Sequence, residues 1–155
     1  MNKYIDKSIK LTEHFSLSEM CTTSVQTADH NYPSQEVITN LKRLAKWLEM
    51  LRDEWNKRYG EGNDPIYINS GYRSPAVNKA VGGVATSNHL TGCAADIRCT
   101  GLEQAFVYAY HLLMISRDWK EDFDELLVEQ SSRSTWIHFA VRASGNRRKV
   151  AFKRV

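Results

Sequence analysis

The sequence is poor in cysteine and has none of the short cysteine spacings that hold metals. Its 155 residues include only Cys21, Cys93 and Cys99, an odd number with no C-x-x-C pair. This count indicates neither a complete disulfide framework nor a thiolate zinc site. We therefore expect free thiols and synthesis in a reducing compartment.

The sequence also lacks a long apolar run. The segment Met1–Lys7 carries charge where a secretory signal peptide needs an apolar stretch. No segment approaches the roughly 18 apolar residues of a membrane span. We therefore expect a protein that is synthesised in the cytoplasm without a signal peptide and has no membrane partner, and any export would need other machinery.

An excess of one charge is missing too. The formal net charge is +3, and the lysines and arginines are scattered among aspartates and glutamates rather than clustered. Nucleic-acid binding needs a concentrated basic surface, so no nucleic-acid partner is expected.

The chain does contain enough apolar material for one core. Hydrophobic residues make up 42% of the sequence, and the length is that of one ordinary domain. We expect a single monomeric domain over residues 1–155. Its predicted parts are an irregular amino-terminal segment (1–33), a core that carries the motifs (34–142) and a tail (143–155).

Capping residues and apolar periodicity predict the helices in the first half. Ser16 and Glu19 have the spacing of a capping box, which predicts a short helix after Ser16. Ser34 can cap a long helix, because apolar residues then recur every three or four positions up to Trp55. One face of this helix is expected to pack on the core.

Two further helices are predicted by local signals. Ser74 followed by proline predicts a brief helix through about Val81. Thr100 and Glu103 have the spacing of another capping box, which predicts a helix that ends near Ser116.

Short runs of β-branched and aromatic residues predict the strands. They lie at 66–68, 93–98, 123–129 and 135–142, with an edge strand at 149–155. The polar turn Gln130–Ser134 predicts that the third and fourth of these form an antiparallel hairpin. Together the elements predict an α+β fold, a small, mostly antiparallel sheet with helices packed on it.

Two histidines and one aspartate are the candidate metal ligands. His89 and Asp96 lie seven residues apart, too far for one ion to join them easily on a regular helix or strand. Gly92 lies between them and permits the chain to turn. The alternation of the last strand places His138 opposite its aliphatic face. Two imidazoles and a carboxylate leave a fourth position open, as a catalytic zinc requires.

Three motifs in order give these ligands a family context. The run S-N-H-L-T-G-C-A-A-D at 87–96 resembles the S-x-H-x-x-G-x-A-x-D signature of the D-alanyl-D-alanine carboxypeptidase-like zinc peptidases, relatives of the lysostaphin and hedgehog fold. The segment 70–74 resembles their S-G-Y-R-S motif, and 136–138 is similar to their W-x-H segment. The resemblance covers about residues 66–142. It implies that His89, Asp96 and His138 bind one zinc ion.

The resemblance also implies roles around the metal. Arg73 is expected to bind substrate and to stabilise the oxyanion that forms when water attacks, whereas an arginine outside the motif would be a surface ion pair. Ser87 is a second candidate for substrate binding, with capping of its own loop as the alternative.

The general base is less clearly marked, because the sequence departs here from the best-known family members. They carry an acid three residues before the last zinc-binding histidine, where this chain has Thr135. Glu129 is the predicted catalytic base, since it ends the strand paired with that of His138. Glu125 shares its strand face but lies further from the turn.

The resemblance implies a metallopeptidase that cleaves peptidoglycan stem peptides, as a D-Ala-D-Ala carboxypeptidase or an endolysin-type endopeptidase. We expect a phage or prophage lysis enzyme that reaches the cell wall once released. Two alternatives stay open: a non-catalytic zinc-containing module that binds cell-wall peptide, and an intracellular dipeptidase.

Overall fold

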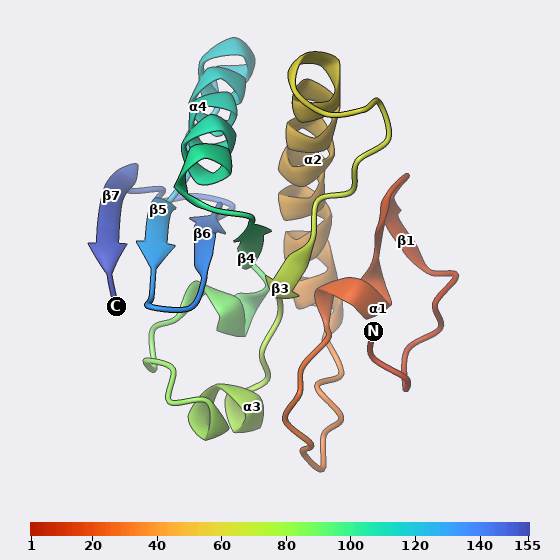
Figure 1. The fold of residues 1–155 in the computed structure, drawn as a ribbon. Coiled ribbons are helices and arrows are strands. Elements are labelled where there is room, and N and C mark those ends of the chain that lie inside the picture. Colours follow the sequence, from red (N-terminus) through yellow and green to blue (C-terminus); the bar gives the residue numbers. More distant parts are fainter.

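Strands with alternating apolar and polar residues form the centre of the molecule, a five-stranded sheet (Figure 1). The computed structural model describes all 155 residues. In spatial order the strands are β3 (Ile68–Ser70), β4 (Ala94–Cys99), β6 (Thr135–Ala140), β5 (Glu125–Gln130) and β7 (Lys149–Arg154). Neighbouring strands are antiparallel except β5 and β7, which run parallel. The predicted α+β class and its mostly antiparallel sheet are confirmed.

Two long helices lie together above the sheet, as Figure 1 shows: α2 (Gln35–Arg58) and α4 (Leu102–Trp119). Aromatic rings join them to the sheet. The ring of Trp47 in α2 meets Trp119 of α4 at 5.2 Å and Phe139 of β6 at 5.3 Å between centroids. Neither helix has the apolar length that a membrane span requires.

Short elements fill the remaining chain. They are β1 (Lys10–Thr12), β2 (Phe15–Ser16), α1 (Leu17–Met20), α3 (Pro75–Ala80) and a 3₁₀ helix, η1 (Asn88–Thr91). The first two strands pair with each other in the segment predicted to be mostly irregular. Strands of two and three residues are too short to leave a recognisable pattern.

Serine caps begin three of the helices as predicted. The hydroxyls of Ser16, Ser34 and Ser74 each accept a hydrogen bond from the backbone N–H three residues later, at 3.1, 3.2 and 3.2 Å. Each bond satisfies a donor that has no partner within the helix.

Two local predictions are wrong. Thr100 does not cap α4, because Gly101 holds that position without a side-chain bond, and the backbone N–H of Thr100 donates instead to the side chain of Gln104. The strand predicted at 66–68 is β3, two residues later, because pairing with β4 sets its extent.

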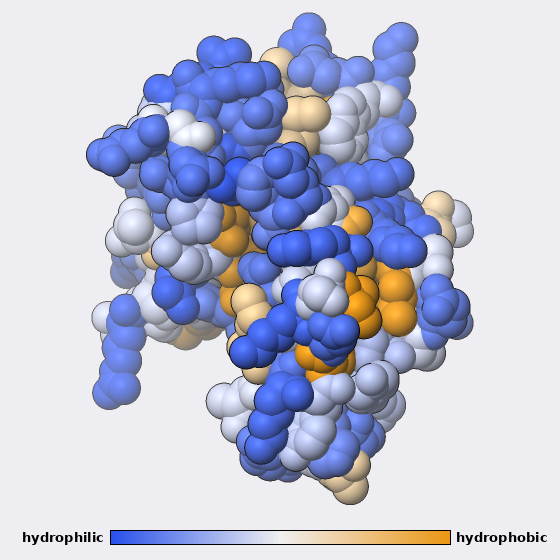
Figure 2. All heavy atoms as spheres, turned by 90° about the vertical axis from the view of Figure 1, so that its right-hand side faces the viewer, coloured by the Kyte–Doolittle hydropathy of each residue, from blue (hydrophilic) through white to orange (hydrophobic).

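Alternation along the strands gives the sheet two different faces. Ile137 and Phe139 of β6 are fully buried on the helix side, while His138 points to the other face. In Figure 2 hydrophilic residues cover most of the visible surface, with small hydrophobic areas between them. The sheet face turned away from the helices is where the candidate ligands lie.

Candidate metal centre

Three elements bring the predicted ligands together. His89 lies in η1, Asp96 in β4 and His138 in β6. Asp96 and His138 are directly opposite each other in the β4–β6 pair, so their side chains share one face of the sheet. One ligand atom from each of the three residues lies within 4.8 Å of the other two.

A tight turn carries the chain from His89 back to β4. Ser87 caps η1, since its hydroxyl accepts the backbone N–H of His89 at 3.2 Å. Gly92 ends η1 with φ of 74°, a left-handed conformation that favours glycine, and a Cβ there would meet Val37 of α2 at 2.9 Å. The predicted role of Gly92 in this turn is confirmed.

A backbone carbonyl fixes the ring of His89. Its Nδ1 lies 2.6 Å from the carbonyl oxygen of Gly71. A carbonyl only accepts hydrogen bonds, so Nδ1 carries the proton and Nε2 presents a lone pair. That Nε2 lies 3.4 Å from Oδ2 of Asp96, and the His89 side chain is only 4% exposed. Gly71 is itself closely packed, because a Cβ there would overlap the carbonyl oxygen of Met20.

The ring of His138 lies between two carboxylates. Its Nδ1 is 3.1 Å from Oδ1 of Asp96, and its Nε2 is 3.1 Å from Oε1 of Glu125. Burial alone would lower the pKa of His138, but the hydrogen bonds to these two carboxylates raise it to about 9. Burial would raise the pKa of Asp96, but the hydrogen bond from His138 and the nearby ring of His89 hold it well below its ordinary value. Asp96 is thus held in its ionised form, in which a carboxylate can act as a metal ligand.

The predicted substrate-binding residues border the ligands. Arg73 Nη2 donates to Asp96 Oδ2 at 3.3 Å, and Arg73 Nε donates to Ser70 Oγ at 3.1 Å. The backbone N–H of Arg73 also donates to the carbonyl oxygen of His89 at 3.0 Å. Arg73 is therefore attached to the centre rather than paired elsewhere on the surface. Ser87 performs the capping that was the alternative to substrate binding.

Glu129, the predicted base, lies on the face of the sheet that carries His138. It stands opposite Trp136 in the β5–β6 pair, two residues from the rung of His138. Burial raises its pKa above the ordinary 4.5, and its side chain makes no hydrogen bond. Thr135, by contrast, is buried opposite Cys99 on the helix side, so its position in this strand cannot direct a side chain at the ligands.

Sequence reasoning passed over the carboxylate that contacts the centre most directly. Glu125 was set aside because of its distance from the hairpin turn, yet it is the residue bonded to His138. The signal that could have found it is the even spacing of 125, 127 and 129, which puts all three on the site face once β5 pairs with β6.

Behind Glu125 lies a polar network, centred on the buried Asp124 and Asn88, that no motif indicated. Asn88 Nδ2 donates to both Asp124 Oδ2 and Glu125 Oε1, at 2.8 Å each, and Asn88 Oδ1 accepts from Arg142 Nε at 2.9 Å. Arg147 makes two side-chain hydrogen bonds to Asp124, at 3.0 and 2.8 Å. Asp124 is completely buried. Its desolvation is outweighed by these bonds, which hold its pKa well below the ordinary value.

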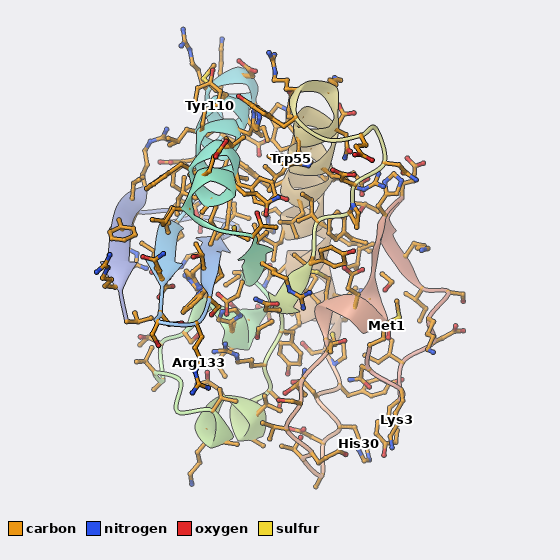
Figure 3. All side chains as sticks on the ribbon, viewed as in Figure 1. Met1, Lys3, His30, Trp55, Tyr110 and Arg133 are labelled. Carbon is orange, nitrogen blue, oxygen red and sulfur yellow. The ribbon has the colours of Figure 1, made fainter.

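The other histidines lie outside the centre. His30 stacks on Tyr4, with ring centroids 3.8 Å apart, and Figure 3 places it beside the amino-terminal segment, away from the sheet. His111 is buried in α4. His14 bonds to Glu49 and approaches Glu13 at 3.8 Å, a solvent-facing group in which Glu13 is 82% exposed. None of them contacts His89, Asp96 or His138.

The donor set at the centre fits zinc. Two imidazole nitrogens and one carboxylate oxygen are ligands that zinc accepts, and three protein ligands leave a position for water or substrate. Glu125 is not within reach of all three ligand atoms, so it does not close the centre as a fourth ligand.

Comparison with known proteins agrees with this geometry. The model of a family described as Peptidase M15 matches residues 13–140, most of the chain, including all three ligands. No curated protein matches the chain.

Proposed function

Because the chain belongs to the peptidase M15 family, and is therefore a zinc-dependent peptidase, we propose that it hydrolyses peptide bonds in the stem peptides of peptidoglycan. The convergence of His89, Asp96 and His138 is the observation that carries the reaction class. The motifs shared with D-alanyl-D-alanine carboxypeptidase-like enzymes support the substrate. A carboxypeptidase that removes a terminal D-alanine and an endopeptidase both fit this proposal.

In this proposal the three ligands hold one zinc ion. His89 offers Nε2, because its Nδ1 is bonded to a carbonyl, and Asp96 offers a carboxylate oxygen between the two rings. Zinc bound in such a centre supplies Lewis-acid activation of water and of the scissile carbonyl. Burial of the ligands limits competing contact with bulk water, because the side chains of His89, Asp96 and His138 are 4, 16 and 13% exposed.

Glu129 is the proposed general base and acid. It takes a proton from the attacking water and delivers it to the leaving amine. Its carboxylate is half-buried and free of hydrogen bonds, and burial raises its pKa above 4.5, closer to neutral pH, as a proton shuttle requires. Its place on the face that carries His138 supports the same role.

Arg73 and Ser87 are proposed to hold the substrate. Arg73 lies at the edge of the centre, 20% exposed, and its two side-chain bonds leave N–H groups free to bind the carbonyl oxygen as negative charge develops on it. The hydroxyl of Ser87 accepts a hydrogen bond from His89 N–H, so its own proton remains available to a substrate carbonyl.

Purified muropeptides test the proposal directly. The protein is incubated with them in the presence of zinc and, separately, of a chelator, and the products are analysed by mass spectrometry. We expect cleavage that the chelator abolishes, and the mass lost identifies terminal or internal cleavage.

Other outcomes would replace the proposed substrate. Binding of muropeptides without chelator-sensitive cleavage would indicate a binding module. Hydrolysis of free dipeptides with no action on muropeptides or intact sacculi would indicate a dipeptidase.

A further inference from the structure

We infer that Glu125 is a positioning residue that holds the ring of His138 with Nδ1 directed at the metal ion. The inference rests on the proposed function, because it concerns the same centre. It deepens that function by naming the side chain that keeps one metal-binding ring in place.

The two nitrogens of His138 face different partners. Nδ1 points to Asp96, which also meets His89, so this edge of the ring faces the cluster of ligand atoms. Nε2 points to Glu125, which does not belong to that cluster. A carboxylate can only accept at Nε2, so Nε2 keeps its proton and Nδ1 provides the lone pair when the ion binds.

Glu125 is itself held firmly enough to fix the ring. Its Oε1 accepts from Asn88 Nδ2 at 2.8 Å as well as from His138 Nε2, and Arg147 Nη2 lies 3.8 Å from its Oε2. The Glu125 side chain is 15% exposed and Asn88 is buried. Asn88 directly precedes His89 in the chain, so a single amide links Glu125 to the turn that carries the other histidine ligand.

The chemical effect follows from the charge of the acceptor. A carboxylate bonded to the far nitrogen of a metal-binding imidazole fixes its orientation and raises its basicity, which strengthens the bond to the metal. Glu129 cannot do this, because it makes no hydrogen bond to His138 although it lies on the same strand and face. The two glutamates therefore offer a matched pair of substitutions.

Zinc affinity measures the predicted role without any substrate. Competition with a chromophoric chelator is expected to show a loss of roughly 10-fold to 100-fold in zinc affinity for Glu125→Ala. Glu125→Gln keeps an acceptor oxygen and is expected to lose less. Glu129→Ala, the matched control, is expected to bind zinc as the wild type does. Equal affinity of a folded Glu125→Ala and the wild type would overturn the inference.

A spectroscopic measurement on the unaltered protein keeps the inference falsifiable even if Glu125→Ala does not fold. In the cadmium-substituted protein with isotope-labelled histidine nitrogens, the NMR coupling between nitrogen and cadmium identifies the ring nitrogen bound to the metal. We expect coupling to Nδ1 of His138, and coupling to Nε2 would overturn the inference. A protein that binds zinc but leaves muropeptides intact would contradict the proposed substrate and leave these two measurements valid.

Discussion

The two ends of β5 place a carboxylate in opposite surroundings. At its start, hydrogen bonds from His138 and Asn88 outweigh burial and hold the pKa of Glu125 well below 4.5. At its end, Glu129 accepts no hydrogen bond, and burial raises its pKa above 4.5. Both side chains point to the same face of the sheet, so orientation does not explain the contrast.

The contrast separates a carboxylate that holds a ring from one that can move a proton. A strongly hydrogen-bonded carboxylate has little tendency to take up a proton, whereas a desolvated one accepts it more readily. Opposite shifts in a pair of nearby acids are a useful guide to their roles in an active site. The following experiments test this distinction.

Removing the ring between the two carboxylates has the largest expected effect. His138→Ala lacks one of three ligands, so we expect loss of bound zinc and hydrolysis at background level. Metal analysis and the muropeptide assay measure these two effects. His30→Ala, a change in a histidine outside the centre, serves as the control and should keep both. Full zinc content in His138→Ala would remove β6 from the ligand set.

Removing the carboxylate of Glu129, which accepts no hydrogen bond, has the second largest expected effect. Glu129→Ala is expected to keep its zinc and to lose about 100-fold to 10,000-fold in kcat, the contribution of a general base. Metal analysis paired with steady-state kinetics on muropeptides checks this. Full activity in Glu129→Ala would show that another group transfers the proton.

A smaller effect is expected in the network behind Glu125. Asp124→Asn weakens charged hydrogen bonds at a completely buried site, so we expect a loss of about 1.5–3 kcal/mol in the free energy of unfolding at pH 7. Denaturant unfolding followed by circular dichroism measures the loss.

The same variant has a predicted pH dependence. The pKa of Asp124 in the folded protein lies below its ordinary 3.8, so its carboxylate stabilises the fold above about pH 4, and this stability is lost as the pH falls further. The difference between wild type and Asp124→Asn should therefore narrow in acid. A difference that stays constant from pH 7 to acid would argue against a stabilising carboxylate.

The smallest predicted effect is on the pH profile. Glu129 must be ionised to accept a proton, and its pKa is raised, so kcat/KM should increase with pH through a value above the ordinary 4.5. Measurements of kcat/KM across the acid range locate this limb. A limb below pH 4.5 would indicate that Glu129 does not set it.

Local signals in the sequence predicted much of the fold. Ser34 and the apolar period after it predicted α2, and the polar turn after Gln130 predicted the β5–β6 hairpin, because caps and turns depend on neighbouring residues. Figure 3 shows Arg133 at the tip of that hairpin. The extent of β3 was missed, since pairing with β4 determines it.

In the metal centre, the three ligands were predicted but two of the residues that surround them were not. Motifs identified the three residues whose ligand atoms converge, because one motif contains both His89 and Asp96 and another contains His138. Glu125 and Asn88 were missed, since their contacts depend on the register of β5 with β6 and on the path of η1. A sequence pattern specifies neither the strand register nor the path of η1.

Gly71 connects the amino-terminal part of the chain to the chemistry. Its carbonyl oxygen accepts a hydrogen bond from His89, and its Cα is packed against the carbonyl of Met20 in α1. The backbone N–H of Tyr72 donates to that same Met20 carbonyl at 2.8 Å. Shortened forms that begin after α1 would therefore lose the support beneath the loop that sets the protonated nitrogen of His89. Such forms would contain all three family motifs and still bind the ion less tightly.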